Sequence, residues 1–164
     1  MGGAPMARYA SAREFFEAVA AASGEADRIG RELAEMEGRA ASLGGGGFEP
    51  RVRSTPEPDR MASRVASKVD REGMLERRQD ECYEVIDAAC RVLYGPDNRS
   101  GLYALVGWPA DAIYHHYLAL RTWEDAARLV GYSVRHVQSC VRVAFELADA
   151  NGQMWTELGV GMAE

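Results

Sequence analysis

An apolar seam with alternating steps of four and three residues runs through the first third of the chain. It has nine positions over four heptads: Phe15, Val19, Ala22, Ala26, Ile29, Leu33, Met36, Ala40 and Leu43. A mean spacing of 3.5 residues keeps such a stripe on one side of an α-helix, as in a coiled coil or a helical hairpin. Three of the nine positions are alanine, so the stripe is thin and the helix needs a partner. That partner is either the same chain or a second copy, and the sequence leaves both open.

Glycine and proline then divide the chain. Four consecutive glycines, Gly44 to Gly47, cannot hold a helix and end the first one. Pro56 and Pro58 exclude a helix interior, and Asp59 is the expected N-cap of a second long helix over about residues 60–94. A Gly-Pro-Asp-Asn turn ends that helix. Residues 101–107 are short and apolar and fit either a brief strand or a helical turn.

The last third of the chain carries start and stop signals for further helices. Pro109 suits the first turn of one helix. Thr122-Trp-Glu-Asp125 has the pattern of a capping box before an apolar run, and Gly131 is a typical residue after a helix end. Ser133 is the expected N-cap of a final helix. The sequence therefore predicts an all-α fold.

The predicted organisation has four segments. Residues 1–49 form an N-terminal helical or coiled-coil segment with a glycine-rich linker, and residues 50–107 form the second long helix and a connector. Residues 108–152 form a helix-turn-helix domain, and residues 153–164 form a tail. The fold expected as a whole is a long helical hairpin or coiled coil followed by a C-terminal helix-turn-helix.

The helix-turn-helix prediction rests on two helices, residues 123–130 and 134–150, joined by Gly131-Tyr132-Ser133. Ala127, Val137 and Cys140 are expected to fix the angle between the helices. In such a corner, arginine can bind guanine and glutamine can bind adenine with two hydrogen bonds each. The helix start can hold a phosphate. The side chains expected to contact double-stranded DNA are Ser133, Arg135, His136, Gln138, Ser139 and Arg142. An ordinary packed corner of two helices, with no DNA contact, is the alternative.

The distribution of charge argues against strong binding by a single copy. The chain carries a net charge of −6, and residues 108–164 hold four arginines against seven acidic residues. Residues 50–72 alone have a basic excess, with six basic residues against four acids. A self-sufficient DNA-binding domain usually has a clear basic surface. We therefore expect weak intrinsic affinity that a homodimer, or a protein already on DNA, increases.

Several motifs resemble one family. Tyr117-Leu118, Trp123-Glu-Asp-Ala-Ala127, Leu129-Val-Gly-Tyr-Ser133 and Arg135-His-Val137 resemble the C-terminal part of phage and prophage regulators of the sigma-factor region 4 type. These include the late-gene regulators of the ArpU kind and related uncharacterised phage proteins. Arg53-Ser-Thr-Pro-Glu-Pro-Asp-Arg-Met61 is also similar, so that the resemblance covers about residues 50–150. It implies a DNA-binding transcriptional regulator without catalysis. The cysteine usage separately predicts a reduced, cytoplasmic protein. The alternative is a helical interaction module that docks on RNA polymerase or another phage protein without direct DNA binding.

Signals for other chemistry are missing from the sequence. The three cysteines, Cys82, Cys90 and Cys140, have no CxxC spacing, so neither a disulfide framework nor a zinc site is expected. His115 and His116 are adjacent on a helix and point in different directions, which excludes joint chelation of one metal ion. The glycine run lacks the Lys-Ser/Thr of a phosphate loop. No 18-residue apolar segment is present, so no membrane contact is expected. We expect no enzyme activity, no cofactor and no metal.

Overall fold

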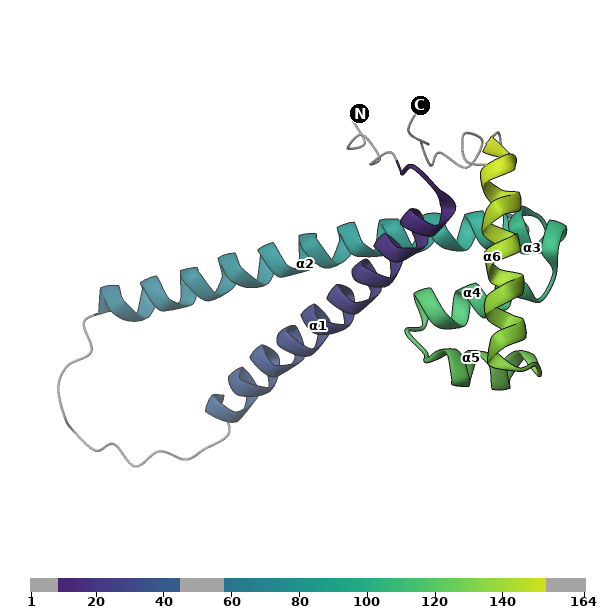
Figure 1. Cartoon of the computed structure of the whole chain (residues 1–164). Coiled ribbons are helices and arrows are strands. Elements are labelled where there is room, and N and C mark those ends of the chain that lie inside the picture. The colour runs from purple at the N-terminus through teal and green to yellow at the C-terminus, as the bar shows by residue number, and fades with distance from the viewer. Residues whose placement is uncertain (1–8, 45–57, 153–164) are drawn as a thin grey trace. The chain divides into compact units, whose positions relative to one another are not determined.

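A computed structural model describes residues 9–44 and 58–152, and all regular elements in these ranges are helices (Figure 1). The predicted all-α fold class is therefore confirmed. The elements are α1 (Ala12–Gly44), α2 (Pro58–Tyr94), α3 (Gly101–Val106), α4 (Pro109–Ile113), the π-helix η1 (Tyr114–Leu118), α5 (Trp123–Val130) and α6 (Val134–Ala150). None of the described helices is long and apolar enough to cross a membrane.

The structure corrects one local expectation from the sequence and decides one alternative that the sequence left open. Helix α2 begins at Pro58, so Asp59 lies inside the first turn and is not the N-cap. A proline is favourable there because its fixed φ matches the helix and its missing N–H would have no partner in the first turn. The apolar run after Gly101 is helical, which decides between the strand and the helical turn.

The chain divides into two compact units, one of residues 1–24 and 82–164 and the other of residues 25–81. Helices α1 and α2 each contribute one part to both units. The four segments expected from the sequence follow chain order, whereas these units combine segments that are far apart in the chain. That four-segment organisation stays a prediction.

The first unit packs the start of α1 into the core formed by the C-terminal helices. Phe16 is fully buried. Its ring stacks on that of Phe145 in α6 at a centroid distance of 5.6 Å and lies 6.0 Å from that of Tyr117 in η1. The backbone N–H of Ala12 donates to Oδ1 of Asp149 at 2.7 Å. The first turns of α1 are therefore held against α6 by both an aromatic contact and a hydrogen bond.

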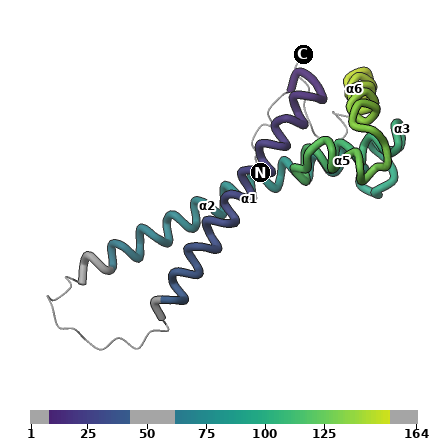
Figure 2. The backbone as a smooth tube through the Cα atoms, turned by 60° about the horizontal axis from the view of Figure 1, so that its bottom comes forward, coloured from purple at the N-terminus to yellow at the C-terminus, as the bar shows by residue number. Residues whose placement is uncertain are grey.

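The second unit consists of α1 from residue 25 and α2 up to residue 81. Arg78 forms an ion pair with Glu25 at 2.6 Å, and Arg71 pairs with Glu32. The amide Nε2 of Gln79 donates to the carbonyl of Ala26 at 3.3 Å. The two helices separate toward residues 44 and 58 in both views (Figures 1 and 2). Polar links thus join the pair where the helices are close together.

Burial of the heptad seam varies along α1. Phe15 and Val19 in the first unit are buried, as are Ala26 and Ile29 in the second. Farther along, Leu33 and Met36 are half-buried and Ala40 is exposed. The question of a partner is therefore answered for the start of the seam, which packs within the chain.

Candidate nucleic-acid interface

The start of helix α5 is fixed by a local side-chain cap. The Thr122 hydroxyl oxygen accepts a hydrogen bond from the backbone N–H of Asp125 at 3.2 Å, and the same hydroxyl lies 3.1 Å from a carboxylate oxygen of Asp125. Asp125 also forms an ion pair with Arg128 at 2.8 Å. This agrees with the Thr-to-Asp capping pattern in the sequence.

The turn between α5 and α6 is built from Gly131, Tyr132 and Ser133. Gly131 has φ 83° and ψ 26°, the left-handed conformation that glycine adopts without strain. The backbone N–H groups of Gly131 and Tyr132 both donate to the carbonyl of Ala127, at 2.9 and 3.1 Å. The Ser133 hydroxyl accepts from the N–H of His136 at 3.4 Å and caps α6. These bonds end one helix and begin the next within three residues.

One side of α6 packs into the core of the first unit, and the other side is exposed. The buried side chains recur at helical spacing: Val137, Val141, Ala144, Phe145 and Ala148. Ala126 and Ala127 of α5 are buried as well. Cys140, which we expected to help fix the helix angle, is half-buried. The inner contact therefore depends on Ala127 and Val137 more than on the thiol.

Four of the six predicted DNA-contacting residues are exposed on α6 without a partner in the described part of the chain. They are Arg135, Gln138, Ser139 and Arg142. None of them forms a hydrogen bond or an ion pair with another described residue. Two guanidinium groups, one amide and one hydroxyl are thus available to a ligand on one helix.

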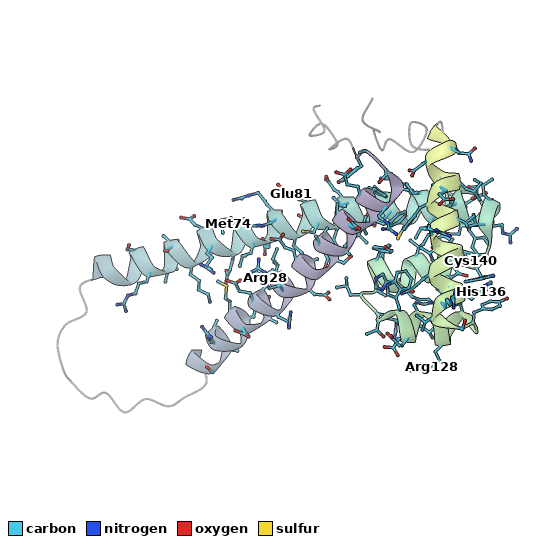
Figure 3. All side chains as sticks on the ribbon, in the orientation of Figure 1. Arg28, Met74, Glu81, Arg128, His136 and Cys140 are labelled. Atoms are coloured by element: carbon cyan, nitrogen blue, oxygen red, sulfur yellow. The ribbon has the colours of Figure 1, made fainter. Side chains whose placement is uncertain are left out.

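The other two predicted residues already have contacts. The Ser133 hydroxyl is used as the helix cap. The His136 ring is exposed but lies 5.7 Å from the Trp108 ring and 5.3 Å from the Tyr132 ring, and Trp108 and Tyr132 themselves stack at 4.4 Å. His136 Nε2 is also 3.7 Å from Sγ of Cys140, its neighbour on α6 (Figure 3). His136 therefore belongs to an aromatic cluster on one flank of the helix.

A hollow of about 360 Å³ lies on another flank of α6. The residues that line it come from α1, η1, α5 and α6: Arg13, Glu17, Tyr117, Trp123, Gln138, Val141, Arg142 and Phe145. Gln138 and Arg142 were predicted as contact residues, whereas Arg13, Glu17 and Tyr117 were missed. Nothing in the local sequence connects the first turns of α1 with residues more than a hundred positions later.

The two adjacent histidines lie in separate surroundings. His116 Nδ1 lies 2.8 Å from the carbonyl of Arg121, and its ring stacks on the Trp123 ring at 3.8 Å. His115 Nδ1 is buried, and no described residue forms a hydrogen bond with it. Within residues 9–44 and 58–152, no group of three or more His, Cys, Asp or Glu side chains is arranged to hold a metal ion.

Comparisons of the chain with protein-family models, with curated proteins and with solved structures found no match.

Proposed function

We propose that this chain is a phage-type transcriptional regulator that binds double-stranded DNA through α5 and α6. In this proposal the two helices act as a sigma region 4-like helix-turn-helix. Helix α6 enters the major groove, and α5 crosses the backbone. Helix α5 and the turn support α6, and no catalytic step is involved.

The observation that carries the proposal is the set of unpaired side chains on α6. Arg135 and Arg142 are exposed and form no ion pair with a described residue, although the same unit pairs Arg128 with Asp125. An arginine without an acidic partner does not have to break an ion pair before it binds a base or a phosphate. Arg135 is the second residue of α6, at the end of the helix that reads bases in this type of corner.

Acidic residues limit how much of α6 can approach DNA. Glu146 is exposed three turns after Arg135, and Asp149 near the helix end already accepts the hydrogen bond from Ala12. Negative side chains next to phosphates repel them. The proposed contact is therefore confined to the first half of α6. This fits a weak single-copy affinity and a homodimer as the binding form.

The test is fluorescence anisotropy with duplex fragments from around the protein's own gene, from low to physiological salt. We expect binding that depends on the fragment and weakens as salt increases. Arg135→Ala should weaken specific binding by about 1–3 kcal/mol, since a bidentate contact to guanine is lost. An equal loss on all fragments would instead identify Arg135 as a phosphate contact.

Arg99→Ala is the matched control, because it removes one exposed arginine from the turn before α3. The affinity of this variant for the duplex fragments should be close to that of the unmodified protein. Flat anisotropy at the lowest salt would reject direct DNA binding.

A second candidate function is docking on RNA polymerase or another phage protein. In this alternative, Val65 and Val69, which are 61% and 59% exposed on α2, would contact the partner protein and not a second copy of the chain. A pull-down with RNA polymerase that is lost in a Val65→Asp/Val69→Asp variant, together with flat anisotropy, would support this alternative.

A further inference from the structure

We propose that the hollow beside α6 binds one phosphodiester group of the DNA backbone, and that the first turns of α1 therefore belong to the DNA interface. This inference rests on the proposed DNA-binding function. It adds Arg13 and Tyr117 to the contact surface and gives Arg142 and Gln138 the role of backbone contacts.

The Tyr117 hydroxyl is the first reason to expect a ligand in the hollow. The side chain is only 9% exposed, and its ring packs 6.0 Å from the Phe16 ring and 5.8 Å from the Phe145 ring. Its hydroxyl forms no hydrogen bond with any described residue, yet Tyr117 lines the hollow. The hydroxyl donor is therefore free for a group that enters the hollow. A tyrosine hydroxyl is protonated near pH 7 and able to donate, and burial raises its pKa further.

The second reason is that two more elements supply donors to the same space. Arg13 comes from α1, and Gln138 and Arg142 come from α6. Within the described part of the chain, none of the three forms a hydrogen bond or an ion pair. Guanidinium groups present paired N–H donors that match the oxygens of a phosphate. Arginine, amide and tyrosine side chains are all common phosphate contacts in DNA complexes.

The position of Arg13 relative to α6 is fixed by its neighbours. The N–H of Ala12 is bonded to Asp149 on α6 at 2.7 Å, and Phe16 stacks on Phe145. These two contacts lie immediately before and one turn after Arg13. The guanidinium therefore extends from an anchored helix turn, which lowers the entropy lost when it binds a ligand.

The charge of the hollow selects the type of phosphate. Arg13 and Arg142 contribute two positive charges and Glu17 contributes one negative charge, which leaves one positive charge. A phosphodiester carries one negative charge, whereas a phosphomonoester carries about 1.5 to 2 near pH 7. The hollow thus suits a group within a nucleic-acid backbone better than a terminal phosphate.

The decisive experiment compares salt-dependent duplex binding by the full chain and three variants. Arg13→Gln should lower the affinity about three- to tenfold on every duplex and reduce the salt slope by about 1, as expected for one lost phosphate contact. Arg99→Gln removes the same charge outside the hollow and should leave the affinity nearly unchanged.

Tyr117→Phe separates ligand binding from a structural role. It keeps the ring packing and removes only the hydroxyl. We expect weaker duplex binding, with the free protein about as stable as the parent in urea, because the hydroxyl forms no hydrogen bond with a described residue that the substitution would remove. A loss of stability together with unchanged affinity would overturn the assignment.

The outcomes distinguish this inference from the proposed function. If Arg13→Gln binds duplexes like the parent while Arg135→Ala binds weakly, the phosphodiester site is rejected and the regulator stands. If no duplex binds, the regulator is rejected, and titration with dimethyl phosphate, a free phosphodiester, decides the hollow. A saturable change in tryptophan fluorescence that Arg13→Gln abolishes would then support a phosphodiester site, since Trp123 lines the hollow. No change would overturn the site.

Discussion

At the scale of single residues, backbone conformation fixes the corner between α5 and α6. Gly131 has φ 83°, and a side chain added there would have open space around it. Gly101 has φ 71°, but its added Cβ would lie 2.7 Å from the carbonyl oxygen of Val92 and 2.8 Å from the N atom of Gly95. Both positions require a left-handed residue, and only Gly101 also requires the absence of a side chain.

Alanine substitutions at these two glycines should therefore have unequal effects. We expect Gly131→Ala to lower the free energy of unfolding by about 1–2 kcal/mol, the cost of left-handed backbone for a residue with Cβ. Gly101→Ala should cost clearly more because a backbone clash is added. Urea denaturation followed by circular dichroism measures both. Equal losses would contradict the steric argument.

Single residues also show which features of the corner and of the hollow the sequence predicts. The roles of Thr122, Gly131 and Ser133 are predictable from the sequence, because their effects on the backbone act within three or four residues. The hollow was not predictable, because Arg13 and Arg142 are brought together by the packing of Phe16 on Phe145. Phe16 lies outside the heptad seam and its burial depends on tertiary contacts, which periodicity does not encode.

At the scale of elements, one hydrogen bond joins the end of α2 to α4. The Tyr94 hydroxyl donates to Oδ1 of Asp111 at 2.8 Å. Burial, and then the Asp111 carboxylate, raise the pKa of Tyr94 far above its ordinary value. In the unfolded chain the hydroxyl ionises near pH 10. The folded state keeps its proton to higher pH, so the contribution of Tyr94 to stability is present below about pH 10 and is lost as the pH rises further.

Tyr94→Phe should therefore destabilise the protein at pH 7 and reduce the alkaline loss of stability. We expect a loss of about 1–2 kcal/mol at pH 7, since the bond to a carboxylate disappears. Between pH 10 and 11 the difference from the parent should become smaller. Denaturation at several pH values tests this, with the exposed Tyr83→Phe as control. A difference that stays constant with pH would show that Tyr94 ionisation is not coupled to folding.

A second feature at the scale of elements is the part of the heptad seam of α1 that lies in the second unit. The heptad pattern predicted α1 as a continuous helix, and α1 does run from Ala12 to Gly44. The pattern did not show that Ala26 and Ile29 would be buried while Ala40 would be exposed. Coverage depends on where α2 lies beside α1, and the ion pairs of Arg71 and Arg78 mark that region. Periodicity gives the face of a helix but not the length over which a neighbour covers it.

At the scale of the whole molecule, a net charge of −6 must be reconciled with binding to a polyanion. A single copy presents few unpaired arginines on α6, and the acidic chain opposes approach to DNA through its long-range field. Linking two copies turns the second contact into an intramolecular step, which raises affinity without new contacts on either copy. The proposed regulator should therefore act as a homodimer, and the second unit carries exposed apolar side chains suited to that contact.

A double substitution on α2 tests this coupling. Val65 and Val69 lie one turn apart and are each about 60% exposed, so Val65→Asp/Val69→Asp should leave the fold intact. We expect sedimentation velocity to shift from dimer to monomer, and the apparent duplex affinity to fall at least tenfold. Leu105→Asp, at an exposed position of α3, is the control and should change neither. A parent protein that sediments as a monomer at concentrations that saturate DNA would show that a single copy is sufficient, and the unpaired groups of α6 and of the hollow would then have to supply the whole affinity.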